Sequence, residues 1–366
     1  MIDQLEIRPY RLPLRQPWRS ARGVMGERRG WLVCAGAEGL HGYGDCAPLP
    51  EAGTETEEQA GLALTLWRSL VLGRSPAQAL ADLDQDPASA PAARHALECA
   101  LLDLSAQGAG LPLRHWFDPG APNQIEVNGT LGALAEVTAE RVQTACREGL
   151  RVLKLKVGLE APSVELRRLR DLSRQLPIGV ALRLDANGAW DYDAAAPLVE
   201  ALNALPIESL EEPLRHPDFA ALGRLQTLAC FPLALDETLR QGEVIDTLDH
   251  LPVRRLVLKP AAVGGLRQTL DLARRAATAG KEVVVTSLIE SAAGIWPSLQ
   301  LATLLPSPLP HGLTTSSWLA RDLGRPPARG GRWMGLDSKA GSGFQPDKNR
   351  NPALYPQGTD WVASSI

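Results

Sequence analysis

The chain has 366 residues, of which 45% are hydrophobic and 22% charged, and its net charge is −4. This composition is ordinary for a globular protein, and the length allows a barrel plus one smaller domain. Basic residues form no run longer than an arginine pair, and no apolar stretch approaches the about 20 residues of a membrane span. We therefore exclude nucleic-acid and membrane partners and expect a cytoplasmic protein, because the first residues also lack the apolar core of a signal peptide.

The first part of the chain predicts a small α+β domain over residues 1–120. Alternating apolar residues and glycine breaks predict strands at residues 4–12, 30–37 and 40–44. Thr54 or Thr56 is suited to cap a helix through TEEQAGLALTLWRSL, and a second helix is expected at residues 92–107. Between the first two strands, the polar and glycine-containing residues 16–26 predict a loop that is suited to act as a lid.

The middle of the chain predicts a barrel of alternating strands and helices over residues 121–328. Its first strand is expected at residues 125–128 and its last near residues 311–313. The helical patterns lie at residues 134–148, 163–175, 194–203 and 265–279, and Gly149 and Gly280 suit helix ends. The tail, residues 329–366, is rich in glycine and proline and is expected to pack back on the first domain.

Six polar residues end successive apolar runs of this middle segment. The runs read RVLKLKV, VALRLDAN, ESLEEP, LALDE and RRLVLKP, and their last polar residues are 23 to 29 positions apart. That spacing suits one strand plus one crossover helix, so it indicates a (β/α)₈ barrel, whose active sites lie at the C-terminal ends of the strands. The six residues are Lys154, Lys156, Asp185, Glu211, Asp236 and Lys259.

Strand geometry places the lysines in the mouth of this barrel. Side chains alternate along a strand, so Lys154 and Lys156 point the same way, and burying both under helices would be costly. Counted from a first strand at residue 127, this pair lies on strand 2 and Lys259 on strand 6. Strands 2 and 6 are opposite in a ring of eight, so the two lysine sites face each other with three carboxylates between them.

Three carboxylates that converge in one cleft cannot all stay ionised unaided, and a divalent cation resolves the conflict. Carboxylate ligands favour Mg²⁺, with Mn²⁺ as a substitute. Glu211 is preferred to Glu212 as a ligand because it shares the inward parity of its strand. Glu237, next to Asp236, is expected to point outward or to contact the ligands from behind.

In combination, the motifs LKLKVG, RLDANGAW, LEEPL, LALDE, VLKPAAVGG and TSLIESAAG closely resemble the enolase superfamily, in its muconate-cycloisomerase-like subgroup. The resemblance is strong over residues 120–322 and looser for GYGDCAPLP and ALECALLDL, which are similar to the capping domain of that family. It implies an α/β fold, a modified TIM barrel with an N-terminal α+β capping domain. The family is often oligomeric, but the sequence is silent on whether this chain is.

The resemblance also implies a chemistry: Mg²⁺-dependent removal of a proton α to a carboxylate of a small-molecule substrate, through an enediolate. Lys156 would be the base, with Lys154 as its hydrogen-bonding neighbour. Lys259 would act on the opposite face as a second acid/base or as a cation beside the substrate. Asp185, Glu211 and Asp236 would be the Mg²⁺ ligands, and Asn187 a partner of those ligands.

Residues after the last barrel strands narrow the reaction. VVVTSLIES lacks the histidine of mandelate-racemase-like enzymes, and HGLTTSSWLARDL has hydroxyls where dipeptide epimerases carry an Asp-x-Asp pair. Both stretches look more like o-succinylbenzoate synthase, which implies syn dehydration of the cyclohexadiene carboxylate SHCHC in menaquinone synthesis. N-acylamino-acid racemases and cycloisomerases share the scaffold, so these alternatives stay open. A non-catalytic barrel is disfavoured because all six site residues are intact.

Five further residues are candidates for binding the substrate. Trp18 is suited to stack on a ring, and Arg19 or Arg22 to pair with a second substrate carboxylate. Ser287 and Ser291, near the end of strand 7, are similar candidates. The alternative for residues 16–26 is an ordinary surface hairpin loop with no role in binding.

Overall fold

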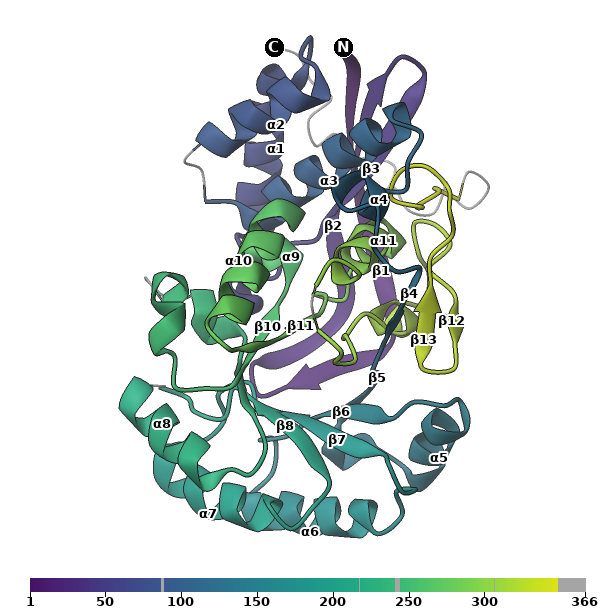
Figure 1. The fold of residues 1–366 in the computed structure, drawn as a ribbon. Helices are drawn as coiled ribbons and strands as arrows, with labels where there is room; N and C mark the ends of the chain where they lie inside the picture. Colours follow the sequence, from purple (N-terminus) through teal and green to yellow (C-terminus); the bar gives the residue numbers. More distant parts are fainter. Residues whose placement is uncertain (87–88, 217, 241–243, 306, 348–366) are drawn as a thin grey trace.

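The computed structural model describes residues 1–86, 89–216, 218–240, 244–305 and 307–347 (Figure 1). A three-stranded antiparallel sheet with its helices forms an N-terminal unit, and a curled parallel sheet surrounded by helices forms most of the remainder. The long first hairpin extends from the N-terminal unit to the parallel sheet (Figure 1). No helix in the described ranges is both long and apolar enough to cross a membrane.

The N-terminal sheet has the three predicted strands in the predicted order. They are β1 (Ile2–Ser20), β2 (Gly23–Ala37) and β3 (Leu40–Cys46). The loop predicted at residues 16–26 is wrong, because the pairs Trp18↔Met25 and Ser20↔Gly23 continue the hairpin to its tip. Polar residues occupy much of both ribbon faces here, so the sequence has no apolar alternation to reveal the strands.

Helices of the N-terminal unit lie beside its sheet, and among them α3 packs against β2 and β3. They are η1 (Pro50–Ala52), α1 (Glu57–Val71), α2 (Pro76–Gln85), α3 (Pro91–Gly108) and α4 (Leu113–Phe117). Thr56, and not Thr54, caps α1, since its hydroxyl accepts a hydrogen bond from the Gln59 amide. α3 lies so close to β3 that a Cβ on Gly44 would meet the Ala96 carbonyl oxygen at 1.9 Å, so this position needs glycine.

The barrel sheet has seven parallel strands in sequence order. They are β5 (Gly129–Ala133), β6 (Val152–Lys156), β7 (Ala181–Asp185), β8 (Ile207–Glu211), β9 (Leu233–Leu235), β10 (Arg255–Leu258) and β11 (Glu282–Val285). The eighth position is a bridge segment, in which His311 pairs with Val127 and Gly312 pairs with Thr286. The predicted barrel is therefore confirmed, with its end near residues 311–313 in place.

The four crossover helices predicted from the sequence are present, and further helical elements lie among the barrel strands. The elements are η2 (Leu134–Glu136), α5 (Ala139–Arg147), α6 (Pro162–Ser173), α7 (Tyr192–Leu202), α8 (Phe219–Leu228), η3 (Glu237–Arg240), η4 (Val244–His250), α9 (Pro260–Val263), α10 (Leu266–Thr278), α11 (Ala292–Ala302) and η5 (Thr315–Trp318). The helix predicted at residues 134–148 is divided, because Thr138 caps α5. Gly149 and Gly280 adopt positive φ just beyond α5 and α10, as expected for helix ends.

The first barrel strand was expected at residues 125–128, and this prediction is correct for its second half only, because Val127 pairs with His311 where the barrel closes. Residues 124–126 form β4 (Gln124–Glu126), which pairs antiparallel with β13 (Trp333–Gly335), itself paired with β12 (Arg329–Gly330). The strand beside β6 is instead β5, whose glycines weaken the apolar pattern. Further along the tail, Gly341 accepts a hydrogen bond from the Leu113 amide, so this segment contacts the N-terminal unit. Residues 348–366 lie outside the described ranges.

Candidate active site

Strand register brings the predicted site residues together at the C-terminal ends of the barrel strands. Lys156 lies opposite Asp185, and Asp185 lies opposite Glu211, so three neighbouring strands present them in one row. Asp236 follows the end of β9, and Lys259 follows the end of β10. All five residues are buried, and none of them is more than 8% exposed.

Ammonium and carboxylate groups alternate across this row. Lys154 Nζ lies 2.6 Å from Glu211 Oε2 and 2.8 Å from Asp185 Oδ2, and Lys156 Nζ lies 2.6 Å from the same Asp185 oxygen. Lys259 donates to Asp236 Oδ2. The two lysines of β6 thus share one carboxylate oxygen, while the third lysine holds a different acid.

The acids of the cluster differ in how easily they ionise. Burial raises the pKa of Glu211 well above its ordinary value, and the charge of Asp185 adds to the effect. Burial acts the same way on Asp185, but the ammonium groups of Lys154 and Lys156 outweigh it and lower the pKa of Asp185. Burial tends to lower the pKa of Lys154, yet its two carboxylate partners raise it overall. The cluster therefore does not hold all acids ionised on equal terms.

Three carboxylates at neighbouring strand ends form a donor set that suits a divalent cation. In this structure the ammonium groups of the lysines pair with those carboxylates. Within the described ranges, no three His, Cys, Asp or Glu side chains are arranged to hold a metal ion. Lys154 bridges Asp185 and Glu211 in this structure, while Lys259 and Arg240 bind Asp236. Glu211 Oε1 is buried and finds no hydrogen-bond partner among the described residues. An unpartnered oxygen in a group of three acids is what a hard cation such as Mg²⁺ would satisfy.

Glu212 has a different role from its neighbour. Its side chain accepts hydrogen bonds from the Asp236 amide at 2.6 Å, from the Thr238 amide at 2.8 Å and from the Thr238 hydroxyl at 2.7 Å. Burial and the nearby Glu237 raise the pKa of Glu212 to about 7. Glu212 fixes the turn that presents Asp236, and sequence reasoning did not assign it this function. In the sequence, only strand parity hints at this difference, because Glu212 shares the parity of Leu210 and not that of Glu211.

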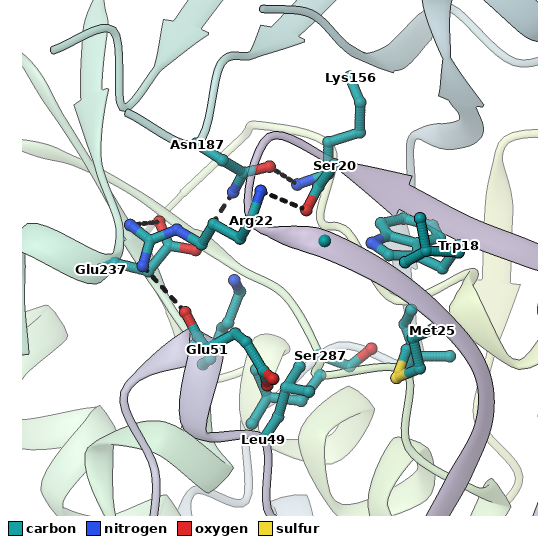
Figure 2. Close-up of a pocket in the computed structure, with 16 residues that line it drawn as sticks. Trp18, Ser20, Arg22, Met25, Leu49, Glu51, Lys156, Asn187, Glu237 and Ser287 are labelled. Carbon is teal, nitrogen blue, oxygen red and sulfur yellow. Dashed lines mark hydrogen bonds and ion pairs between the residues drawn. The ribbon is translucent and has the colours of Figure 1, made fainter. Parts of the chain in front are cut away.

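A pocket of about 240 Å³ lies over Lys156 and Lys259, between the hairpin tip and the barrel mouth (Figure 2). The hairpin contributes Trp18 and Arg22 among other residues, and the loop after β3 contributes residues 49, 51 and 52. The segment after β11 contributes Ser287 and its two successors. Lysines from two opposite sides of the barrel therefore line one small cavity that the N-terminal hairpin covers.

A chain of polar contacts runs from Lys156 to the hairpin (Figure 2). Lys156 Nζ donates to Asn187 Oδ1 at 2.7 Å, and Asn187 Nδ2 donates to Glu237 Oε1 at 3.2 Å. Arg22 Nη2 lies 3.8 Å from Glu237 Oε2, and Arg22 Nη1 donates to the Glu51 carbonyl at 2.9 Å. Glu237 therefore does not point outward, which was one of the two expectations, and it contacts Asn187 instead.

Trp18 forms an aromatic wall of this pocket. Its ring centroid lies 5.6 Å from Lys156 Nζ and 4.7 Å from the ring of Trp318, with which it makes an edge-to-face contact. Met25, on the paired strand, lines the same side of the cavity. The indole is thus placed where a substrate ring above Lys156 would meet it.

Two of the predicted substrate-binding residues are placed elsewhere. Arg19 Nε lies 2.9 Å from Glu136 Oε1, because it alternates with Trp18 and Ser20 along β1 and points to the other face. Ser291 is buried as the N-cap of α11, where its hydroxyl donates to Asp45 at 2.7 Å. Both predictions of a pocket contact are wrong for geometric reasons that strand parity and helix capping explain.

Two family matches cover most of the chain. Residues 137–350 match the family described as enolase C-terminal domain-like, which is more than half of the chain. Residues 3–104 match the family described as MenC, N-terminal domain. The two matches correspond to the barrel with its tail and to the N-terminal unit.

Relatives with several activities are similar to this chain. An o-succinylbenzoate synthase of Desulfotalea psychrophila is 28% identical over 359 residues, which cover 87% of this chain and 95% of that protein. An N-succinylamino acid racemase of Thermus thermophilus is 30% identical over 316 residues, 83% of each chain. The dipeptide epimerase of Enterococcus faecalis, solved with Mg and the dipeptide L-Leu-L-Tyr, has a TM-score of 0.87 at 25% identity and covers 94% of this chain and 99% of its own. Fold, site residues and these matches together establish that the chain belongs to the enolase superfamily.

Proposed function

We propose that this protein is a Mg²⁺-dependent lyase that removes the α-proton of SHCHC and expels its hydroxyl group from the same face, giving o-succinylbenzoate. The coarser part of this proposal, an enzyme of the enolase superfamily, follows from the family match. The choice of reaction is supported most by the N-terminal unit, because residues 3–104 match the MenC N-terminal domain. That match adds to the similarity to an o-succinylbenzoate synthase over 359 residues.

Asp185, Glu211 and Asp236 would hold the Mg²⁺ ion, since they are acids at the C-terminal ends of three neighbouring strands and Glu211 Oε1 has no hydrogen-bond partner among the described residues. When bound, Mg²⁺ supplies positive charge beside the substrate carboxylate and so makes the α-proton more acidic. Lys154, with contacts to two of these acids, keeps their oxygens oriented. The relative from E. faecalis was solved with Mg, which supports the same metal here.

Lys156 is the proposed acid and base of the reaction. Its Nζ lines the pocket, and Asn187 Oδ1, 2.7 Å away, orients it. As a neutral amine it takes the α-proton as the C–H bond breaks, and as an ammonium it returns a proton to the departing hydroxyl as the C–O bond breaks. A carbon–carbon double bond forms, and the proton and the hydroxyl group leave together as one molecule of water. One lysine is sufficient because both groups leave from one face.

The remaining pocket residues suit the rest of the substrate. Lys259, on the opposite side, is buried beside Asp236 and places a cation next to the ring. Trp18 provides a flat apolar wall near Lys156. Arg22, at the rim, is suited to pair with the second carboxylate on the succinyl arm. Ser287 bonds to Thr315, so hydroxyls occupy the side where a free amine would need acids.

An N-succinylamino acid racemase is the second candidate, and one geometric observation favours it. Lys156 and Lys259 line one pocket from opposite sides of the barrel, as two-sided proton transfer requires. The 30% identity to the racemase of Thermus thermophilus supports it as well. Both reactions begin with the same proton abstraction, so they differ only in whether the intermediate loses hydroxide or regains a proton.

The test uses the full chain with Mg²⁺. We expect SHCHC to be converted to the aromatic product, followed by its ultraviolet absorbance, and N-succinyl amino acids in D₂O to show slower α-exchange, followed by NMR. Exchange with inversion and no turnover of SHCHC would replace the lyase with the racemase. Neither reaction at any Mg²⁺ concentration would refute both.

Two nearby arginines give a matched test of substrate recognition. Arg22→Met is expected to raise KM about tenfold with little change in kcat, because it removes a charge at the pocket rim. Arg19→Met should leave both constants unchanged, because Arg19 pairs with Glu136 away from the pocket. Equal effects of the two substitutions would contradict the assignment of Arg22.

A further inference from the structure

A strained residue lies in the wall of the pocket. Ile289 has φ of +61°, a left-handed conformation that is rare for a β-branched residue. In the described ranges, the other non-glycine residues with positive φ are Glu38, Asn187 and Glu212. Asn187 and Glu212 belong to the site, and Ile289 lines the pocket with Ser287 and Leu288. Strain of this kind persists only where surrounding contacts enforce it.

Arg28 of the N-terminal unit is one of those contacts. It extends from β2, is 3% exposed, and its Nε donates to the Ile289 carbonyl at 3.3 Å. Its other nitrogens donate to the Ala47 carbonyl at 2.5 Å and to the Pro48 carbonyl at 3.0 Å. One guanidinium therefore joins the loop after β3 to the strained segment after β11, and both line the pocket.

Asp45 holds the same segment from its other end. It is fully buried at the end of β3 and accepts from the Ser291 amide and hydroxyl, each at 2.7 Å. The Tyr10 hydroxyl, 2.5 Å away, orients it. A Cβ on Gly294 would lie 3.2 Å from the Asp45 Cβ, so α11 packs directly on this carboxylate. Two buried residues of one unit thus fix both ends of a short segment of the other.

We propose that Arg28 and Asp45 are positioning residues that hold residues 287–291 in the conformation in which Ile289 has a positive φ. They thereby set the shape of the pocket wall that residues 287–289 form. The proposal rests on the proposed function for the identity of the substrate. The lysines and acids of the site are positioned by strand register within the barrel, and they do not depend on the contacts of Arg28 and Asp45. Loosening the segment therefore weakens binding of the substrate's side arm and leaves the proton-transfer step nearly intact.

Arg28→Met is the main variant, and Arg28→Lys is the conservative one, since a lysine keeps the charge but reaches fewer carbonyls. Arg114→Met is the matched control. Arg114 is 1% exposed and joins α4 to α11 through Gln300 at 3.1 Å, and it does not line the pocket. The Arg114→Met variant tests whether the loss of any buried arginine between the two units raises KM as Arg28→Met does.

For Arg28→Met we expect KM to rise about tenfold on SHCHC while kcat changes less than about threefold. We expect Arg28→Lys to lie between this variant and the wild type, and Arg114→Met to keep the wild-type KM. Amide hydrogen exchange gives a readout that needs no turnover, and residues 287–292 should exchange at least about tenfold faster in Arg28→Met with the barrel strands unchanged.

The proposal is overturned if exchange at residues 287–292 stays at the wild-type rate in Arg28→Met. It is also overturned if KM rises equally in Arg28→Met and Arg114→Met, since that indicates general destabilisation. Failure of the proposed function gives a different result, namely a wild-type protein that is inactive on SHCHC and on N-succinyl amino acids. The hydrogen-exchange comparison of the wild type with Arg28→Met needs no activity, so it tests the positioning role in that case as well.

Discussion

The barrel has a network of ion pairs at each end, and the two networks are built from different residues. At the N-terminal ends of the strands, Arg183 Nε lies 2.9 Å from Glu208, and Arg255 lies 2.5 Å from Glu208 and 2.8 Å from Glu282. At the C-terminal ends the anions are the three acids of the site, and the cations are the three lysines with Arg240 as a further partner of Asp236. Arg183 and Asp185 are two residues apart on β7, so one strand serves both networks.

The difference separates a network suited to stability from one suited to chemistry. Both oxygens of Glu208 have arginine partners, which outweigh the effect of burial and lower the pKa of Glu208 to about 2. In the mouth, Glu211 has an unpartnered oxygen and a raised pKa. Arginine binds carboxylates through a rigid fork, whereas lysine is a point charge that can release its partner and move a proton. Substitutions in each network test whether one contributes mainly to stability and the other mainly to catalysis.

The largest effect is expected at Lys156. Replacing it with alanine should lower kcat by roughly 10³–10⁴-fold, because the proposed acid and base of the reaction is lost. Thermal stability should not fall, since Asp185 keeps Lys154 as a partner. Lys339→Ala, at an exposed lysine near Asp337, is the control for expression and charge and should retain full activity. More than a tenth of the wild-type kcat in Lys156→Ala would contradict the assignment.

The network at the other end should respond in the opposite way. Arg255→Met removes one arginine partner from Glu208, which keeps Arg183, and a partner from the more exposed Glu282, so it should lower the free energy of unfolding by about 2–3 kcal/mol. kcat of the folded fraction should stay within about twofold. Urea unfolding measures the first quantity. Arg174→Met, at an exposed pair with Asp171, should change stability by less than about 1 kcal/mol. An equal loss in the two variants would remove the distinction.

Metal binding should depend on the mouth alone. Glu211→Gln should weaken Mg²⁺ binding by about a hundredfold, because one of three anionic ligands is lost. Stability without Mg²⁺ should be unchanged or higher, because a buried acid with an unpartnered oxygen is replaced by a neutral group of the same size. Calorimetric titration of Mg²⁺ measures the affinity. Unchanged affinity would mean that the three acids do not hold the metal.

The smallest effect concerns pH and His311, which lies where the barrel closes. Burial, together with the charge of Arg183, lowers the pKa of His311 to about 3 from 6.5. The folded protein keeps the ring neutral, and its Nδ1 accepts from the Val285 amide at 3.0 Å. The unfolded chain binds a proton below pH 6.5, so this stability is complete above pH 6.5 and is lost as pH falls toward 3.

Between pH 7 and pH 5 this linkage amounts to about 2 kcal/mol of unfolding free energy. Urea unfolding of the wild type and of His311→Asn at both pH values should show that the wild type loses about that much more. Asparagine is suited as the control because it can accept the same hydrogen bond but does not titrate. Parallel pH profiles of the two proteins would show that His311 is not the group responsible.

Sequence patterns were most informative where one physical constraint dominates. Lysines in LKLKV and an aspartate in LRLDAN sit in apolar strands, and period-two alternation is enough to place them on one face. The same parity distinguishes Glu211 from Glu212, whose side chain instead holds the turn before Thr238. The crossover helices and the ring of strands follow from the regular spacing of these runs.

Patterns failed where partners come from distant parts of the chain. The hairpin tip at residues 16–26 is polar on both faces, so nothing local predicts its strands or that Trp18 meets Lys156 while Arg19 meets Glu136. Residues 125–128 have a strand pattern, but only contact with β13 assigns β4 to a different sheet. Ser291 is a plausible pocket hydroxyl in the sequence, but the start of α11 and Asp45 hold it as a cap.

By itself, the sequence determined the barrel and the set of lysines and acids, because strand alternation and strand–helix spacing are local properties of the chain, and the resemblance of its motifs pointed to the family. Tertiary structure alone decided which side chains form the pocket walls, that Arg28 and Asp45 join the two units, and that Ile289 is strained. The contacts of Arg28 with Ile289 and of Asp45 with Ser291 join residues more than 200 positions apart, which no local pattern encodes.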